Sequence, residues 1–291
     1  TLPDSWIWAR TQQLIRDTNR LFDNHQYGEA GRYIYDFFWG EYADWYLEIA
    51  KNQISEGGDR AFYTVETLIK VLDLCLRLLH PFTPFVTEEI WQHLRDAVLD
   101  SPLQDRLPEW PEALMIAPWP ESREPEGWEE DKIKDFNLIQ EIIRTIRNLR
   151  AEKNIKPGKR IPAKLVGGDH TKTLGDALKS IIALAALDPD TTSLVPALEQ
   201  VSPTDIALVA GPVEIYLPLS GLVDLEEEKS RLKSDLEEIN QQIQRLEKLL
   251  AGPFSQKAPP EVVEKEQEKL NEYLETSRTL QDLLSNLDDQ S

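Results

Sequence analysis

The sequence predicts a mainly α-helical protein with one small α/β unit, and three changes of pattern along the chain support this. Over most of residues 1–158, apolar residues recur at helical spacing, which is typical of an antiparallel helix bundle. Short β-like runs broken by glycine and proline follow over residues 159–220. In residues 221–291, apolar residues step by alternating four and three, the period of a coiled coil. We therefore predict three domains with these bounds, the last of them an antiparallel coiled-coil hairpin.

The bundle is predicted to be organised around Leu68–Trp91. Apolar side chains cover nearly the whole circumference of the helix that this stretch begins, which favours a central position. Pro81 should end that helix, because a proline has no N–H and disfavours the α region for the residue before it. Thr87 is predicted to cap the next helix, which runs to about Val98. Cys75 lies on the central helix, where we expect it to pack as a small hydrophobe.

The other predicted helices surround this stretch. Asp4 or Ser5 should cap the first, the second covers about Glu29–Lys51, and a long fifth helix covers about Glu129–Glu152. Residues 101–127 contain six prolines and no period, so we expect an irregular strap over the bundle, pinned by Trp110 and Trp119. Within the α/β unit, the apolar run 174–187 favours a helix.

Composition limits the possible functions. A total of 32 basic and 52 acidic residues gives a net charge of −20, so any contact with nucleic-acid phosphates must come from local basic patches. A single cysteine excludes an internal disulfide and fits a reducing compartment. No apolar run approaches the ~20 residues of a membrane span. The chain begins TLPDSW, with neither an initiator methionine nor a signal peptide, and is therefore expected to be a piece of a longer protein.

One local basic patch follows the fifth predicted helix. Between positions 142 and 164, eight basic residues accompany one acidic residue, a local charge of +7. Three arginines step by three along the helix and should form one slanted row that could follow phosphates. The alternative is a solvated face that balances the acidic surface. The candidate residues are Arg144, Arg147, Arg150, Lys153, Lys156 and Lys159, with Arg160 and Lys164 beyond them.

The predicted hairpin is acidic overall, with nine basic and sixteen acidic residues between positions 222 and 288. Its tip is less acidic, because Arg245, Lys248 and Lys257 lie there and Lys269 lies on the returning helix. Such an arm would touch RNA only at its far end, where Phe254 could stack on exposed bases. A connector or a dimerisation seam is the alternative interpretation.

An aromatic cluster on the second helix comprises Phe37, Phe38, Trp39 and Trp45. Base stacking would use such rings, but most of them share the inward face of the helix, which favours packing in the core. The histidines at 80 and 93 are interpreted as a helix-end residue and a surface residue.

Several segments resemble a known family. YDFFWGEYADWYLEIAK at 35–51, LLHPFTPFVTEEIW at 78–91 and APWPE at 117–121 stand in the order and spacing of the helical anticodon-binding domain of class I aminoacyl-tRNA synthetases. LSGLVDLEEEKSRL and GPFSQKAPPEVVEKEQEKL resemble the C-terminal coiled-coil arm of the valyl-tRNA synthetase family. Isoleucyl-type enzymes share a similar bundle but typically end in a cysteine-rich zinc tail, which one cysteine rules out. The resemblance covers nearly the whole chain and is weakest over the α/β unit.

Catalytic signatures of that family are absent from the sequence. The histidines at 25, 80, 93 and 170 form no H-x-x-H metal pair and no H-x-G-H signature, and the single methionine excludes a K-M-S-K-S loop. No glycine-rich phosphate loop, metal site or nucleophile–base pair is found. If the resemblance holds, aminoacylation and editing belong to another part of the polypeptide.

The resemblance implies that the chain is the tRNA-binding C-terminal portion of a cytoplasmic valine–tRNA ligase. Its implied partners are tRNA(Val) and the catalytic domain of the same polypeptide, in a monomer. ATP and Mg would serve that catalytic domain, and no cofactor is expected in this chain. Arg10 is a candidate for residual anticodon contact, and Gln244, Arg245 and Lys269 correspond to arm positions that meet the tRNA elbow. The rival hypothesis is a non-enzymatic interaction module whose arm binds a protein partner or self-associates.

Overall fold

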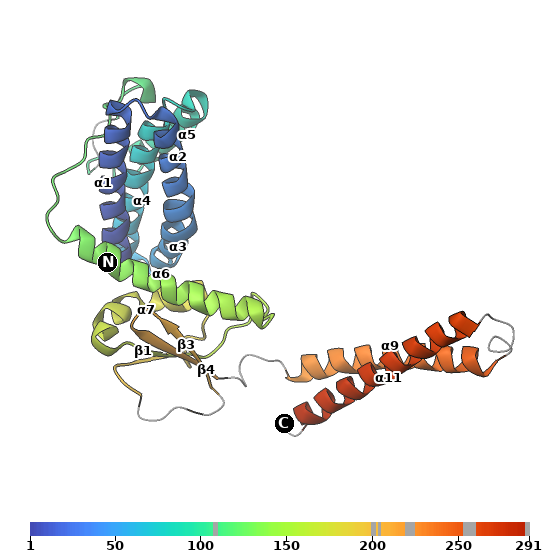
Figure 1. The fold of residues 1–291 in the computed structure, drawn as a ribbon. Coiled ribbons are helices and arrows are strands. Elements are labelled where there is room, and N and C mark those ends of the chain that lie inside the picture. Colours follow the sequence, from blue (N-terminus) through green and yellow to red (C-terminus); the bar gives the residue numbers. More distant parts are fainter. Residues whose placement is uncertain (107–109, 199–201, 203–204, 219–224, 253–259, 289–291) are drawn as a thin grey trace. The chain divides into compact units, whose positions relative to one another are not determined.

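The computed structural model describes all residues except 107–109, 199–201, 203–204, 219–224, 253–259 and 289–291. The described chain is mainly helical and contains one four-stranded mixed sheet, which confirms the predicted fold class. It divides into two compact units, residues 1–218 and 219–291 (Figure 1). The predicted division of the first unit into a bundle and a separate α/β domain stays a prediction.

Helix α4 stands at the centre of the bundle. The bundle comprises α1 (Leu2–Asp23), α2 (Tyr27–Phe37), the π-helical segment η1 (Phe38–Leu47), α3 (Glu48–Ser55), α4 (Gly58–Leu79) and α5 (Pro84–Leu99). All of the other elements in that set pack against α4. Val71, Cys75 and Leu78 on α4 are fully inaccessible to solvent. The predicted central position and the packing role of Cys75 are therefore confirmed.

Both predicted helix caps are wrong by a few residues. Helix α1 has Thr1 at its N-cap, and the Thr1 hydroxyl donates to the Asp4 carboxylate at 2.7 Å. Helix α5 begins at Pro84 after Thr83, because a proline in the first turn needs no partner for an N–H. Thr87 consequently lies inside α5, buried, and its hydroxyl donates to the Thr83 carbonyl at 2.8 Å.

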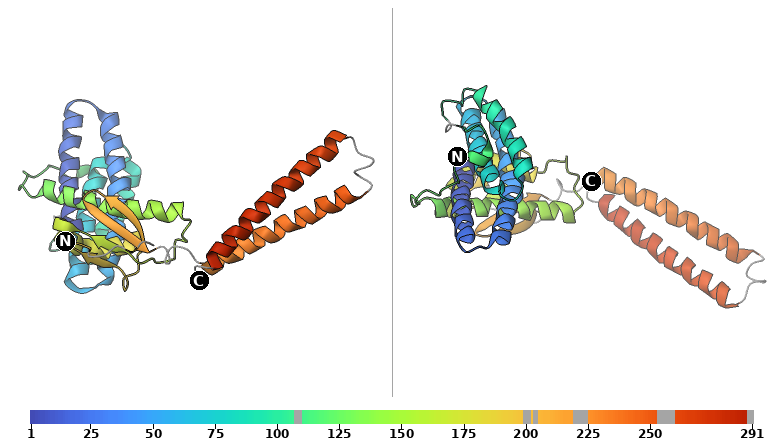
Figure 2. Two further views of the ribbon diagram at one scale, coloured as in Figure 1. Left: turned by 60° about the horizontal axis from the view of Figure 1, so that its bottom comes forward. Right: turned by 90° about the horizontal axis from the view of Figure 1, so that it is seen from above.

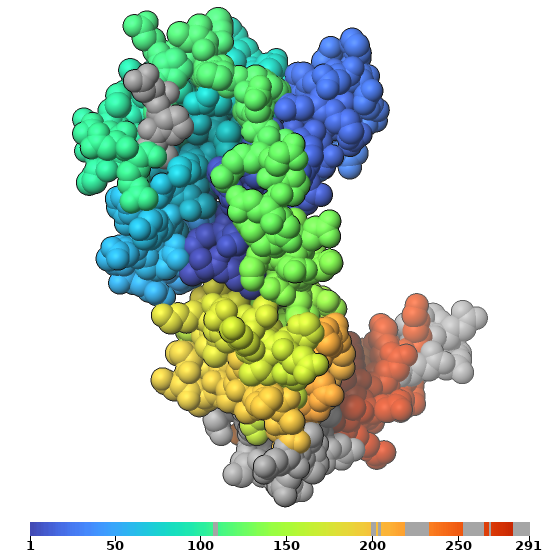
Figure 3. All heavy atoms as spheres, turned by 90° about the vertical axis from the view of Figure 1, so that its left-hand side faces the viewer, coloured from blue at the N-terminus to red at the C-terminus, as the bar shows by residue number. Residues whose placement is uncertain are grey.

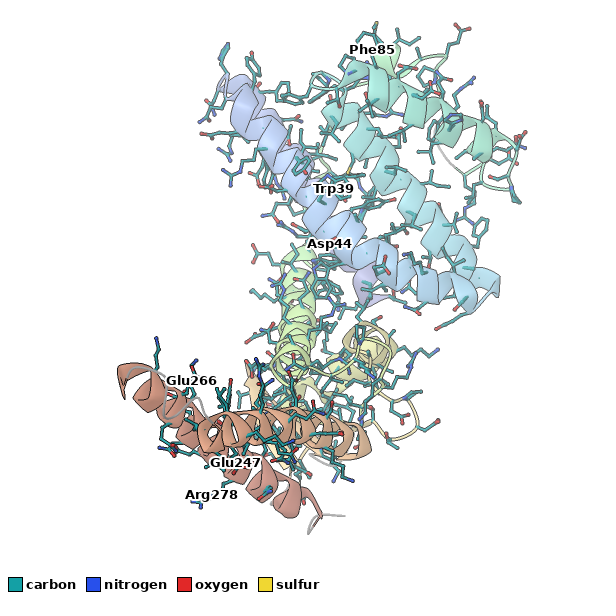
Figure 4. All side chains as sticks on the ribbon, turned by 90° about the vertical axis from the view of Figure 1, so that its right-hand side faces the viewer. Trp39, Asp44, Phe85, Glu247, Glu266 and Arg278 are labelled. Carbon is teal, nitrogen blue, oxygen red and sulfur yellow. The ribbon has the colours of Figure 1, made fainter. Side chains whose placement is uncertain are left out.

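The second predicted helix is divided into three successive helical segments. A π-helical stretch, Phe38–Leu47, separates α2 from α3. Most of the predicted aromatic cluster faces inward, as expected, and one member does not. Phe37 and Trp45 are buried as predicted, whereas Trp39 is 52% exposed and projects from the helix (Figure 4).

The strap between α5 and α6 is irregular, as predicted, apart from the short 3₁₀ turn η2 (Leu114–Ile116). Trp110 packs on the buried Trp91, with ring centroids 5.0 Å apart. The Trp119 indole N–H donates to the Asn19 side chain on α1 at 2.6 Å. The strap continues over α1, where the Arg123 amide donates to the side chain of Gln12 at 2.9 Å (Figure 3).

Helix α6 (Glu129–Glu152) joins the bundle to the sheet, and its bounds agree with the sequence prediction. It contacts α1 on one side and α7 and β3 on the other, and crosses the end of the bundle in Figure 1. Phe136 on α6 stacks on Trp6 of α1 with ring centroids 3.9 Å apart. This buried aromatic pair anchors α6 to the bundle and so positions the basic residues that follow.

The sheet lies beyond α6 and has the strand order β2-β1-β4-β3. Its elements are β1 (Lys164–Val166), α7 (Thr171–Ala185), β2 (Ser193–Val195), β3 (Asp205–Ala210) and β4 (Val213–Pro218), with the short η3 (Gly168–His170) before α7. The strands β1 and β2 are parallel and are connected through α7, whereas the other neighbouring pairs are antiparallel. The β-like runs and the apolar helix of the sequence prediction are present.

The second unit is a helical hairpin of α9 (Leu225–Ala251) and α11 (Pro260–Asp288). The two helices run side by side in both views of Figure 2. Its seam contains Ile243, Leu246 and Leu270, with Ile239, Leu250 and Tyr273 partly buried around them. These residues are the heptad positions of the sequence, so the predicted coiled-coil hairpin is confirmed. The proposed tip residues Phe254 and Lys257 lie outside the described residues.

Candidate nucleic-acid interface

Two of the three arginines in the predicted row lie exposed on α6. The guanidinium of Arg144 lies over the Trp45 ring at 5.4 Å from the centroid, and that of Arg147 lies over the same ring at 5.6 Å. Arg147 Nε also donates to the Leu184 carbonyl at 2.8 Å. Cation–π contacts hold both side chains against the protein while their charges stay at the surface. Phosphate oxygens could approach this pair.

Arg150 is not part of the exposed row. Its residue is 7% exposed, and its guanidinium donates to the carbonyls of Lys156 (3.0 Å), Lys159 (2.8 Å) and Ala186 (3.3 Å). Arg150 therefore binds the loop after α6 to the end of α7. The expectation of one continuous exposed row is wrong at this position, because the guanidinium is satisfied below the surface.

The lysines after α6 continue the positive surface. Lys153 and Lys156 are exposed beside the C-terminus of α6, where the helix dipole favours cations. Lys159 is half-buried. Arg160 is exposed and donates to the Leu187 carbonyl at 3.1 Å, and Lys164 is exposed on β1. The structure thus brings most of the basic candidates to the surface of one region, around the junction of α6 with the sheet.

Arg10 has partners within the protein. Its Nε and Nη2 donate to the two carboxylate oxygens of Glu41 at 2.7 and 2.5 Å, and Nη1 donates to Gln13. The hydrogen bond with Glu41 raises the pKa of Arg10 against the opposing effect of burial. Its charge is therefore balanced by Glu41, and its contact with RNA stays a prediction.

An exposed aromatic pair was missed by the sequence interpretation. The rings of Tyr35 and Trp39 lie 6.2 Å apart on the outside of α2 and η1, and both residues are about half exposed. Tyr35 and Trp39 are four positions apart and each lies two positions from the buried Phe37, so helical spacing places both rings on the outer side. Asp36 and Asp44 are also exposed on these elements, which disfavours phosphate near the pair.

On the hairpin, the described basic candidates are all exposed. Arg245 and Lys248 lie on α9, and Lys269 lies on α11. Lys269 pairs with Glu266 at 2.7 Å, and this contact raises the pKa of the lysine. Figure 4 labels Glu247, Glu266 and Arg278, whose side chains project from the hairpin. Positive and negative side chains therefore alternate over this surface.

His80 and His93 contact neighbouring side chains of the bundle. His80 Nδ1 lies 2.8 Å from the Thr87 hydroxyl, and the exposed His93 pairs with Glu89 at 3.3 Å. Over the described ranges, no three or more His, Cys, Asp and Glu side chains come together as a metal site. In the same part of the chain, no helix has the length and apolar character needed to cross a bilayer.

Comparison with known families identifies the family to which the first unit is similar. Residues 4–165, more than half of the chain, match the family of anticodon-binding domains of tRNA ligases. The chain belongs to this family. Residues 224–288, which form the hairpin, match the tRNA-binding arm of valyl-tRNA synthetases. The two matches confirm the resemblance found in the sequence, and they cover the bundle with α6 and the coiled coil.

Curated relatives of this chain carry the name valine–tRNA ligase. The relative from Carboxydothermus hydrogenoformans is 40% identical over 287 residues, which is 97% of this chain and 30% of that protein. Those from Thermotoga maritima and Bacillus subtilis are 37% and 31% identical, over 98% and 99% of this chain. The chain thus spans about 30% of the length of these relatives.

Proposed function

We propose that this chain is the tRNA-binding C-terminal portion of a valine–tRNA ligase. It would hold tRNA(Val) by the anticodon stem and the elbow, so that the 3′ end reaches a catalytic domain elsewhere in the same polypeptide. The observation that carries the proposal is the pair of family matches, an anticodon-binding domain followed by a tRNA-binding arm. Catalysis with ATP and Mg²⁺ would belong to the other domain, in a cytoplasmic monomer.

The positive surface around the end of α6 supports phosphate contact within the first unit. Arg144, Arg147, Lys153 and Lys156 are exposed there, in a chain whose net charge is −20. A duplex stem is recognised through its phosphates more than through its bases. On the hairpin, Arg245, Lys248 and Lys269 would contact the elbow. Holding the tRNA at two places converts binding energy into positioning of the reacting end.

The experiment is a titration of labelled tRNA(Val), and of a non-cognate tRNA, into the chain at several salt concentrations. Variants would be Arg144→Glu with Lys153→Glu, and removal of residues 222–291. The matched control is Lys132→Glu, because Lys132 lies on the opposite half of α6 and pairs with Asp135. We expect affinity to fall with salt, and to fall at least about tenfold in both test variants, or ~1.4 kcal/mol. Absence of binding at about 50 mM salt would contradict the proposal.

The rival function, a protein-interaction module, has one observation in its favour. The sequence of the hairpin has a net charge of −7 between positions 222 and 288, from nine basic and sixteen acidic residues. Sedimentation separates the two functions. A monomer that binds tRNA supports the ligase portion, whereas a dimer that dissociates when the hairpin is removed supports the interaction module.

A further inference from the structure

Three arginines bind the carbonyl groups at the C-terminal end of α7. Two of them come from α6 and one from the segment that follows α6. Each guanidinium donates to one carbonyl: Arg147 Nε to Leu184 at 2.8 Å, Arg150 Nη1 to Ala186 at 3.3 Å, and Arg160 Nη1 to Leu187 at 3.1 Å. The last carbonyls of a helix have no partner within it, and the helix dipole favours cations at this end. The end of α7 therefore gathers arginines from two segments of the chain.

The chain turns sharply at this end, which keeps the carbonyls close together. Ala186 has the left-handed backbone conformation (φ 52°, ψ 51°), and the Leu187 amide donates back to the Ile182 carbonyl at 2.9 Å. These are the features of a Schellman motif. Leu184 and Leu187 are three positions apart, so their Cα atoms are separated by no more than about 11 Å. The guanidinium groups bound to their carbonyls are consequently neighbours.

Arg147 and Arg160 keep N–H groups that have no partner within the described residues. Both side chains are exposed, and over those residues neither makes a second hydrogen bond or an ion pair, although a guanidinium has five N–H groups. Burial lowers the pKa of Arg147, and nearby Asp44 and Glu48 oppose this shift without pairing with it. Arg150, by contrast, is buried with its donors on carbonyls. The two outer arginines can therefore bind an acceptor from outside the chain.

A phosphate group is the acceptor that suits these two side chains. The planar fork of a guanidinium matches phosphate oxygens and can bind two of them at once. The exposed Lys153 and Lys156 add positive charge on the same side of the junction between α6 and the sheet. A guanidinium that is already fixed by a carbonyl also loses less conformational freedom on binding than a free one.

We propose that the C-terminal end of α7 orients Arg147 and Arg160 as two phosphate-binding groups for the backbone of the tRNA. This inference rests on the proposed function and extends it to another part of the chain. Helix α7 lies in residues 166–223, which stand between the two family matches. That segment thus takes part in tRNA binding by holding arginines in position. Arg147 and Arg160 make the contacts, and Ala186 is a positioning residue.

The first test counts phosphate contacts. Labelled tRNA(Val) is titrated with the 291-residue chain at several salt concentrations, and the slope of log affinity against log salt is compared among variants. Arg147→Gln and Arg160→Gln should each make the slope shallower by about one, since each removes one phosphate contact. The matched control is Arg32→Gln, because Arg32 is exposed on α2 and pairs with Asp36; its slope should equal that of the wild type. Unchanged slopes in both test variants would overturn the proposal.

The second test alters the end of α7 without changing any charge. Ala186→Val places a β-branched residue at a left-handed position, which strains the turn and shifts its carbonyls, whereas Ala186→Gly adopts the same conformation freely. We expect the tRNA affinity to fall at least about threefold with Ala186→Val and to stay unchanged with Ala186→Gly. Circular dichroism checks that both variants are folded.

Arg160→Lys carries this test if Ala186→Val does not fold. It keeps the charge, but one ammonium cannot hold the Leu187 carbonyl and also present a planar fork to a phosphate, so the same loss of about threefold is expected. Equal affinities of the two Ala186 variants, or of Arg160→Lys and the wild type, would mean that the arginines supply only a general positive field, and would overturn the proposal.

Failure of this inference differs from failure of the proposed function. A wild-type chain that binds tRNA while the variants show no effect contradicts only the role of α7. A wild-type chain that does not bind tRNA at about 50 mM salt contradicts both.

Discussion

The indole N–H of Trp91 donates a hydrogen bond to Oδ1 of Asp73 at 2.7 Å, and this contact joins α5 to α4 inside the bundle. The same oxygen accepts from Arg77 Nε at 3.0 Å. Trp91 is fully buried and Asp73 nearly so. A buried indole N–H and a poorly solvated guanidinium therefore depend on one carboxylate, which makes Asp73 a central polar residue of the bundle.

Asp73→Ala should consequently destabilise the protein by about 3 kcal/mol, because it leaves the Trp91 N–H unsatisfied and Arg77 unpaired. Urea unfolding followed by circular dichroism measures the change. Asp36→Ala is the matched control, since its ion pair with Arg32 (3.5 Å) is exposed, and its effect should stay below about 0.5 kcal/mol. Equal effects of the two substitutions would refute the role given to Asp73.

Alanine substitutions at Arg150 and Arg144 should have different effects, the first on folding stability and the second on tRNA affinity. Arg150→Ala removes the guanidinium hydrogen bonds to the carbonyls of Lys156, Lys159 and Ala186, so we expect a loss of about 2 kcal/mol of stability. Arg144→Ala removes one exposed cation–π contact, worth no more than about 1 kcal/mol, and should mainly weaken tRNA binding. The two measurements are urea unfolding and tRNA titration at fixed salt. The assignment fails if Arg144→Ala leaves tRNA affinity unchanged.

Glu88 should make stability depend on pH. Burial opposes its ionisation, but hydrogen bonds from Gln92 and from the amides of Leu114 and Met115 lower its pKa overall. A lowered pKa in the folded state stabilises the protein above the unfolded value of about 4.3, and that contribution is lost as pH falls through the folded value. The stability difference between the wild type and Glu88→Gln should therefore be constant, about 1 kcal/mol, from pH 7 to pH 5, and shrink at lower pH.

Urea titrations between pH 7 and pH 3 measure that difference. The control is Glu121→Gln, since Glu121 is an exposed carboxylate of the same strap, and this substitution should leave stability nearly unchanged throughout. A Glu88→Gln difference that does not vary with pH would show that the charge of Glu88 contributes nothing to holding η2.

Leu246→Ala should destabilise the hairpin alone. Leu246 packs with Ile243 and Leu270 in the seam, and its truncation should cost about 2–4 kcal/mol. Hydrogen exchange resolved by peptide should become faster in α9 and α11. Exchange in residues 1–218 should stay unchanged, because the hairpin is a separate compact unit. Leu249→Ala, at an exposed neighbouring position, should leave hydrogen exchange unchanged in both the hairpin and residues 1–218. Faster exchange in both units would mean that they unfold together.

The sequence alone determined the features that depend on local period. The bounds of α6 agree with prediction, and the heptad residues do form the seam of the hairpin. The central place of α4 followed from its nearly continuous apolar surface. In each case the burial of one face follows from the spacing of apolar residues, which can be read without knowledge of the partner.

Tertiary structure decided which polar groups are free to act. Arg144 and Arg150 have the same chemistry and helical spacing, yet only Arg144 is exposed, because the carbonyls that satisfy Arg150 come from the loop after α6 and from Ala186. Glu41 neutralises Arg10 from 31 positions away. The strand order likewise depends on long-range pairing. These contacts join distant segments, so no local pattern contains them.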